Sequence, residues 1–260
     1  MLSKTGGYVL KRWLSVRHVA AVVWGVLSLA PRPNCWPRTV RSLFGRQILF
    51  TGIEALGIIS LIAFLAGISV VTQTQVWLTR IGQTEMLGSV LVMVIVREVG
   101  PILVNLVVAG RSGTAMAAEL ANMRVRGEIN VLDAQGIEPM QYLVMPRVLG
   151  MAVSVFCLTI IFIALALGTG FVFGFFLKVT TSDPGLFFNN VMSAISPKDI
   201  ANVFAKTIIP GLTTGAISCI SGLSVRGAVT EVPVAVTRSV VASIVTVLVL
   251  SALFSVLTYV

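Results

Sequence analysis

The chain has 260 residues, of which 56% are hydrophobic and only 11% are charged. Ordinary soluble domains carry about 25% charged residues, so this composition excludes an ordinary soluble domain and predicts an all-α integral membrane protein. The net charge of +9 does not indicate a nucleic-acid-binding protein, because eight Lys and Arg residues and no acid precede Glu54. A basic stretch beside a first membrane span is typical of a cytoplasmic anchor at an anionic lipid surface.

Residues 1–47 form a basic N-terminal region, and its segment 6–30 is amphipathic. Lys11, Arg12 and Arg17 alternate there with apolar residues such as Trp13 and Leu14. The uncharged part, residues 19–30, is shorter than the ~20 residues that a spanning helix needs. We therefore predict a helix that lies in the cytoplasmic membrane interface. A short and poorly hydrophobic first span is the alternative.

Residues 48–260 contain the segments that are long and apolar enough to cross a membrane. We predict five spans, at residues 48–79, 86–110, 148–177, 200–225 and 239–260. The sequence shows no internal repeat, and secondary transporters are commonly built from two related halves. Residues 48–260 therefore predict a single membrane domain that is not built from two related halves.

The distribution of Lys and Arg predicts the orientation, because cytoplasmic loops carry an excess of both. With a cytoplasmic N-terminus and five spans, fourteen of these residues lie inside and three, Arg80, Lys178 and Lys198, lie outside. We therefore expect the N-terminus in the cytoplasm and the C-terminus on the outer side.

Three charged residues fall within predicted spans, namely Arg97, Glu98 and Lys206. A charge at bilayer depth is costly, so it usually faces a cavity or a partner. A bridge between Glu98 and Lys206 would leave Arg97 free, and the three charges sum to +1. We expect them to receive an anionic headgroup in a cavity that opens outward. The alternative is a buried ion pair that only fixes helix packing.

No residue pattern in the chain indicates catalysis or a bound metal. The cysteines Cys35, Cys157 and Cys219 lack paired or metal-binding spacing, and the chain has one histidine, His18. No phosphate-binding loop of the P-loop type is present. We therefore expect a protein that is not an enzyme, has no cofactor of its own and takes any energy from another subunit.

The segment 114–135 is polar enough to lie in water and has helical periodicity. Its polar residues Glu119, Asn122, Arg126, Asn130 and Asp133 recur at spacings that predict one stripe on one helix. Gly136 and Pro139 predict its end. Such a helix on the inner membrane face could dock in a groove of a soluble protein. The alternative is a solvated interfacial helix that binds nothing.

Five short motifs follow one another between residues 85 and 150: REVGP at 97–101, AGRSG at 109–113, AELANMR at 118–124, GIEP at 136–139 and PR at 146–147. Together they resemble the MlaE/YrbE family of ABC-transporter permeases, and the resemblance covers about 45–260. It implies a homodimer in a bacterial inner membrane, with an N-terminal interfacial helix and five spans per subunit. It also implies a coupling helix on a cytoplasmic ATPase subunit, which binds the ATP, and a periplasmic MCE-domain protein that passes phospholipid to or from an outer envelope.

The resemblance also assigns residues to two sites. Arg97 and Glu98 match the family's charged pair near the lipid, and Lys206 matches a basic position on the fourth span. The outer ends of the first, second and fifth spans would line the lipid pocket, which adds Gln73, Val76 and Trp77. The coupling residues would be Glu119, Asn122, Arg124, Arg126, Glu128 and Asp133.

One departure from the family pattern concerns the last span. Some relatives carry an acid there, whereas residues 239–260 have none. Lys206 therefore needs another partner, and Glu98 is the available candidate. Two other functions stay open from the residues alone: a carrier coupled to ions or protons through Glu98 and Lys206, and a membrane scaffold that transports nothing.

Overall fold

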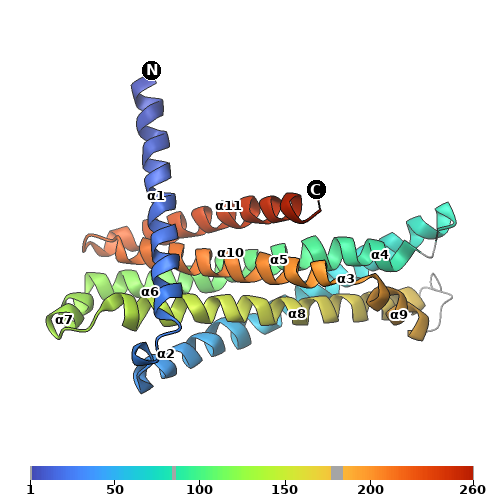
Figure 1. The fold of residues 1–260 in the computed structure, drawn as a ribbon, viewed down its shortest axis with the longest axis horizontal. Coiled ribbons are helices and arrows are strands. Elements are labelled where there is room, and N and C mark those ends of the chain that lie inside the picture. The colour runs from blue at the N-terminus through green and yellow to red at the C-terminus, as the bar shows by residue number, and fades with distance from the viewer. Residues whose placement is uncertain (1, 84–85, 177–183, 260) are drawn as a thin grey trace. The chain divides into compact units, whose positions relative to one another are not determined.

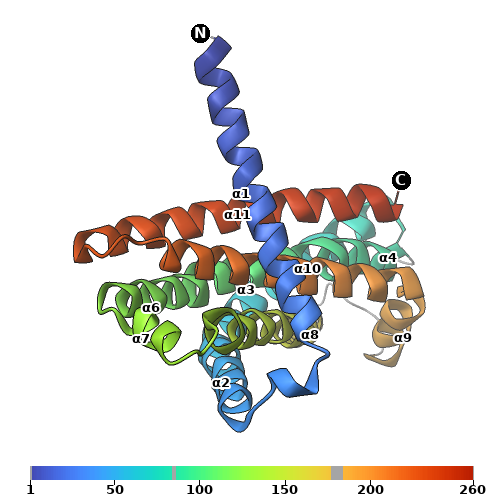
Figure 2. The same ribbon diagram turned by 60° about the vertical axis from the view of Figure 1, so that its left-hand side comes forward.

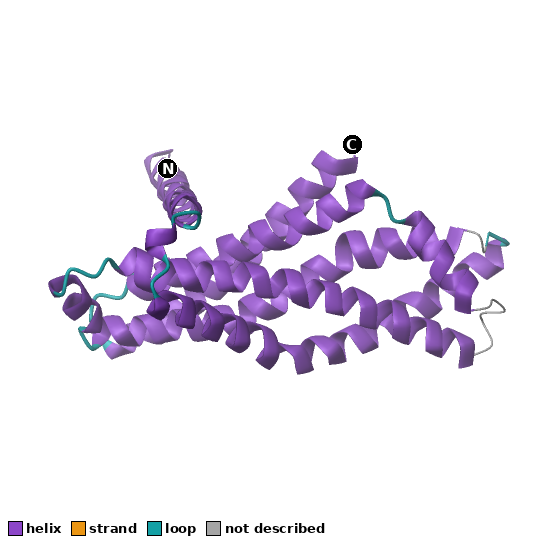
Figure 3. Cartoon of the chain, turned by 60° about the horizontal axis from the view of Figure 1, so that its bottom comes forward, coloured by secondary structure: helices purple, strands orange, loops and turns teal. Residues whose placement is uncertain are grey.

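The structure is a computed structural model that describes residues 2–83, 86–176 and 184–259, and its element order appears in Figure 1. Every regular element in these ranges is a helix (Figure 3). The described helices include five that are long and apolar enough to cross a membrane: Arg38–Ile81, Leu87–Val125, Met140–Phe176, Pro197–Leu223 and Val229–Thr258. The five predicted spans are therefore confirmed as helices.

The chain folds into two compact units. The first unit comprises Met1–Leu49, Ala109–Ala152 and Gly211–Thr246. The second unit comprises Phe50–Val108, Val153–Pro210 and Val247–Val260.

The first unit begins with α1 (Leu2–Leu29), which contains the predicted N-terminal helix. A short 3-10 turn at Pro33–Cys35 separates α1 from α2 (Arg38–Ile48), as Figure 2 shows. Trp36 closes this corner because its indole Nε1 donates to the carbonyl of Ala30 at 2.8 Å and its ring meets the edge of Phe44. Helix starts again at Arg38 because Pro37 has extended backbone and precedes it. The helix that leads into the first predicted span therefore begins ten residues before residue 48.

The rest of the first unit contains α6 (Thr114–Val125), α7 (Glu128–Ala134) and the adjoining ends of α8 (Met145–Phe176), α10 (Pro197–Leu223) and α11 (Val232–Tyr259). Short side chains let α6 lie close to α10. A Cβ atom added at Gly222 would be 2.6 Å from the carbonyl oxygen of Ala117. Ala121, Val225 and Ala235 form the buried cluster beside it. One face of α6 is thus fixed by packing.

The second unit contains α3 (Glu54–Ile81), α4 (Leu87–Leu91), α5 (Gly100–Val108) and α9 (Pro184–Ala194). Helix α3 buries every fourth residue from Ala55 to Gln75, so its buried residues lie along one face of the helix. It comes close to α8 at Gly67, where an added Cβ would lie 2.2 Å from the carbonyl oxygen of Ala166. Helix α9 lies against α4, and Gly88 permits that contact. Glycine thus sets the spacing of the helices in this unit.

The sequence predicts a second span at 86–110 and a separate helix at 114–135, whereas the structure is helical throughout residues 111–113. Between α4 and α6 the chain passes through two π-helical segments, η4 (Val92–Val99) and η5 (Ala109–Gly113). Gly113 has right-handed helical backbone, so α6 continues directly from η5. The interruption comes at Gly127, where φ is 75° and the left-handed conformation suits glycine.

Candidate functional site

The charged cluster of the second unit is built from η4, α10 and α11. The ammonium group of Lys206 donates to Glu98 Oε1 at 2.7 Å, to Ser255 Oγ at 2.6 Å and to the carbonyl oxygen of Arg97 at 2.9 Å. Its three N–H bonds therefore each have an acceptor. Ser255 in turn donates its hydroxyl proton to Glu98 Oε1 at 2.7 Å. The predicted bridge between Glu98 and Lys206 is confirmed.

Arg97 is paired as well, which the sequence did not predict. Its Nε lies 2.8 Å from Asp199 Oδ1, and its Nη2 donates to Asp199 Oδ2 at 3.2 Å. Asp199 is buried and also accepts the backbone N–H of Ser196 at 2.9 Å. The expectation of a free Arg97 and a cluster charge of +1 is therefore wrong. The two basic and two acidic side chains cancel.

The available sequence signal for Asp199 pointed to a structural role. Ser196 and Asp199 have the spacing of a capping box, and Ser196 Oγ accepts the backbone N–H of Lys198 at 3.2 Å. Asp199 therefore performs two tasks, because it closes the first turn of α10 and neutralises Arg97. Ser255 could not be singled out from the sequence, because the last predicted span contains several other small residues.

Two prolines explain why polar side chains cross between the helices at this cluster. Pro101 has no N–H, so it cannot donate to the carbonyl of Arg97 four residues before it, and that carbonyl accepts from Lys206. Pro210 likewise frees the carbonyl of Lys206, which accepts from Asn105 Nδ2 at 3.1 Å. Asn105 is buried, and the same nitrogen also donates to the carbonyl of Pro101 at 2.7 Å. Each helix therefore completes the backbone hydrogen bonding of the other.

The four charged side chains differ in their exposure. Lys206 and Asp199, both on α10, are 0% and 1% exposed, whereas Arg97 and Glu98 on η4 are 23% and 38% exposed. The buried partners therefore neutralise a pair of charges that can still be reached from outside the chain.

The three residues predicted at the outer end of the first span lie on α3. Gln73 is exposed, Trp77 is 56% exposed and Val76 is half-buried. The interactions that define the charged cluster come from η4, α10 and α11, so the structure gives these three residues no part in it. Their contact with lipid stays a prediction.

The first unit contains a surface pocket of about 390 Å³ at the predicted coupling segment. It is lined by Glu119, Asn122, Met123, Arg126 and Glu128. The expected single helix 114–135 with one stripe is wrong, because Gly127 separates α6 from α7. The turn nevertheless brings four of the six predicted coupling residues to one pocket.

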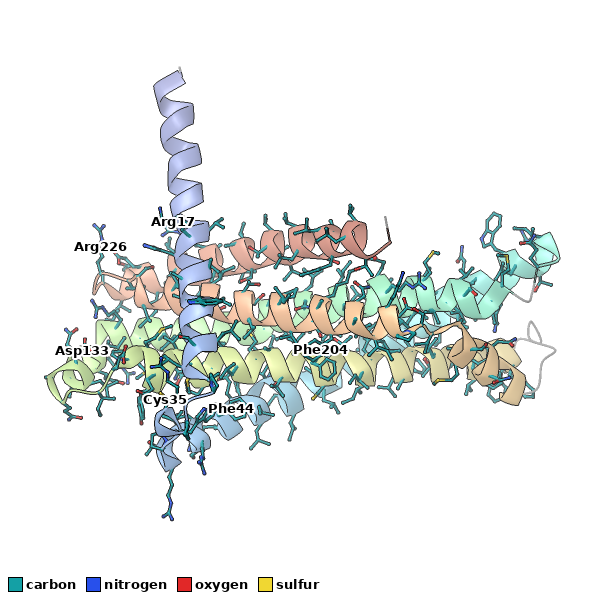
Figure 4. All side chains as sticks on the ribbon, viewed as in Figure 1. Arg17, Cys35, Phe44, Asp133, Phe204 and Arg226 are labelled. Carbon is teal, nitrogen blue, oxygen red and sulfur yellow. The ribbon has the colours of Figure 1, made fainter. Side chains whose placement is uncertain are left out.

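The other two predicted coupling residues lie beside that pocket. Arg124 Nη1 donates to Asn130 Oδ1 at 3.1 Å and so links α6 to α7. Asp133 is exposed on α7, where Figure 4 labels it. Gly136 has φ of 73° and ends this segment, as predicted.

An ion pair ties the pocket to α8. Glu119 is 59% exposed, and its Oε1 accepts from Nη2 of the buried Arg147 at 2.8 Å. On the buried face of α6, Met116 Sδ lies 3.5 Å from Cys219 Sγ of α10. A displacement of α6 would therefore disturb its contacts with both α8 and α10. The described residues contain no group of three metal-ligating side chains.

Comparison with known proteins identifies the family. The family model described as Permease MlaE matches residues 44–257. The chain belongs to the MlaE permease family. The match includes the charged cluster, the pocket and Arg147.

Individual relatives agree with this assignment. The chain is 31% identical over 186 residues to a probable ABC transporter permease protein of Rickettsia prowazekii, covering 72% of this chain and 71% of the relative. It is 32% identical over 240 residues to the chloroplastic protein TRIGALACTOSYLDIACYLGLYCEROL 1 of Arabidopsis thaliana, covering 90% of this chain and 64% of the relative. It is 28% identical over 200 residues to the intermembrane phospholipid transport system permease protein MlaE of Haemophilus influenzae, covering 76% of each.

Proposed function

We propose that this chain is the permease subunit of an ATP-driven ABC transporter that moves phospholipid. The observation that carries the proposal is the family match over residues 44–257, because it spans the five apolar helices and both sites. The permease domain would be residues 48–260, and residues 1–47 would add the interfacial helix. The subunit itself would hydrolyse no ATP.

The charged cluster is proposed as the part that meets the lipid headgroup. Arg97 and Glu98 are partly exposed, although their partners are buried, and intramembrane charges with such access commonly line a substrate path. Gln73, Val76 and Trp77 of α3 would complete the wall. A second copy of the chain would close the pocket, and a periplasmic MCE-domain protein would exchange lipid with it.

The pocket between α6 and α7 is proposed as the contact with a cytoplasmic ATPase subunit. Four of its five lining residues are polar and exposed, whereas the opposite face of α6 is packed against its own unit. Arg147 joins Glu119 to α8, so nucleotide-driven movement of the partner would reach a membrane helix. The N-terminus would then be cytoplasmic and the C-terminus periplasmic, in a bacterial inner membrane.

Purification of the complex from its host in mild detergent tests this function. We expect a nucleotide-binding subunit to co-purify, and we expect Arg126→Glu to reduce its recovery and to abolish ATP-dependent lipid transfer. Lys198→Glu is the control, because that exposed residue would lie on the outer side. Recovery of no ATPase subunit would contradict the proposal.

A second measurement separates ATP-driven transport from ion-coupled transport. Collapse of the proton gradient at constant ATP should leave lipid transfer unchanged. Loss of transfer under that condition would favour an ion-coupled carrier that uses Glu98 and Lys206.

A further inference from the structure

The charged cluster has no net charge, and this bears on which lipid it would accept. Arg97 and Lys206 supply two positive charges, and Asp199 and Glu98 supply two negative charges within 2.8 Å of them. An anionic headgroup would add an uncompensated negative charge beside this neutral group. In surroundings of low polarity such a charge is strongly disfavoured.

The partly exposed side chains of the cluster carry one positive and one negative charge. Arg97 and Glu98 are neighbours in sequence and are the partly exposed members, whereas Asp199 and Lys206 are buried. A guanidinium group binds phosphate well, and a carboxylate attracts an ammonium group. A headgroup with one phosphate and one ammonium joined by a short linker can use both residues. A headgroup with phosphate alone would meet repulsion from Glu98.

We propose that this cluster favours zwitterionic over anionic phospholipid headgroups, and that its net charge of zero, to which Asp199 contributes by neutralising Arg97, sets this preference. The inference rests on the proposed function, since it names the lipid class of the same site. Ser255 is the third determinant, because its hydroxyl lies between Lys206 and Glu98 at a position where an acid would change the net charge.

The test measures which lipids the purified protein retains. Detergent-washed protein is incubated with vesicles of equal parts phosphatidylcholine and phosphatidylglycerol, reisolated, and its lipids are quantified by mass spectrometry. We expect the wild type to be enriched in phosphatidylcholine. Asp199→Asn and Glu98→Gln each leave the cluster at +1 and should shift the ratio toward phosphatidylglycerol by about fivefold. Ser255→Asp should shift it the opposite way.

The matched control restores neutrality without the ion pair. The double variant Arg97→Gln with Asp199→Asn replaces two charges by two amides, and we expect it to return close to the wild-type ratio. A purely structural cluster would change the amount of bound lipid or the stability, but not a ratio that follows the sign of the charge. Glu98→Gln keeps the test valid if the buried Asp199 variant fails to fold.

Two results would overturn the inference, and they have different consequences. A wild type enriched in phosphatidylglycerol, or an unchanged ratio in folded Glu98→Gln protein, removes the headgroup preference and leaves phospholipid transport standing. Retention of no phospholipid above that of an unrelated membrane protein removes the proposed function together with the inference.

Discussion

Lys206 is the residue on which the second unit's polar contacts converge. Its ammonium group is fully buried and has three acceptors, one of them a carboxylate and one the carbonyl of Arg97, to which Pro101 cannot donate. Removing one partner of a buried pair is more damaging than replacing both, because the remaining groups lose their compensation.

Replacement of Lys206 by Met should therefore destabilise the protein. We expect a loss on the order of 2–4 kcal/mol, below the full cost of a broken buried pair because Glu98 is partly exposed. That corresponds to a fall of roughly 4–16 °C in the midpoint of thermal unfolding in one detergent. Lys198→Met, an exposed change on the same helix, is the control and should have little effect. Equal midpoints for the two variants would contradict the pairing.

The charged cluster could be predicted from the sequence only in part. Arg97, Glu98 and Lys206 were identifiable because a charge within an apolar run is conspicuous. Asp199 was not, since it lies at the edge of the apolar run and has the spacing of a helix cap. Its contact with Arg97 joins residues 102 positions apart, and no local pattern encodes such a pairing.

At the scale of helices, close approach between α3 and α8 depends on glycine. A Cβ at Gly67 would lie 2.2 Å from the carbonyl oxygen of Ala166 and 2.4 Å from Thr169 Oγ1, and the first of these is backbone that cannot rotate away. Gly57 lies on the same helix with nothing within 4 Å of such an atom. The two positions thus form a matched pair.

We expect Gly67→Ala to force the two helices apart and to cost about 1–3 kcal/mol. Gly57→Ala should be neutral or stabilising by up to about 1 kcal/mol, because alanine favours helix. Thermal unfolding in detergent distinguishes the two variants. A stable Gly67→Ala protein would show that α3 and α8 pack differently.

The extent of the helices was predictable only in part, for a physical reason. Length and hydropathy mark the five spans, but the ends depend on single backbone conformations. The sequence 111–113 contains a serine and a glycine and still continues as helix, whereas Gly127 adopts a left-handed conformation and stops it. Glycine permits both outcomes, and packing decides between them. The predicted stripe on one helix is therefore divided, although three of its residues, Glu119, Asn122 and Arg126, still line the pocket.

For the whole molecule, the distribution of charge predicts which side of the membrane each loop faces. Of the nineteen Lys and Arg residues, fourteen fall on the side assigned to the cytoplasm and three on the other. Arg226, labelled in Figure 4, and Lys198 are exposed residues on the two predicted sides. They allow a direct test of orientation.

Labelling of single cysteines provides that test in a background with the native cysteines replaced. We expect Lys198→Cys to react with a membrane-impermeant maleimide added outside intact spheroplasts. Arg226→Cys should react only after the membrane is inverted or opened, because its loop faces the cytoplasm by the excess of basic residues. The opposite pattern would reverse the orientation and remove the pocket from any cytoplasmic ATPase.

The exchange of hydrogen bonds around the two prolines has a consequence for how this sequence can evolve. Asn105 is needed because Pro210 leaves the carbonyl of Lys206 without a backbone donor. A descendant that replaced Pro210 by alanine would regain that donor, and selection on position 105 would relax. Positions 105 and 210 are therefore expected to covary among homologues, as are positions 101 and 206. A lineage that loses one residue of a pair should also accept substitutions at the other position.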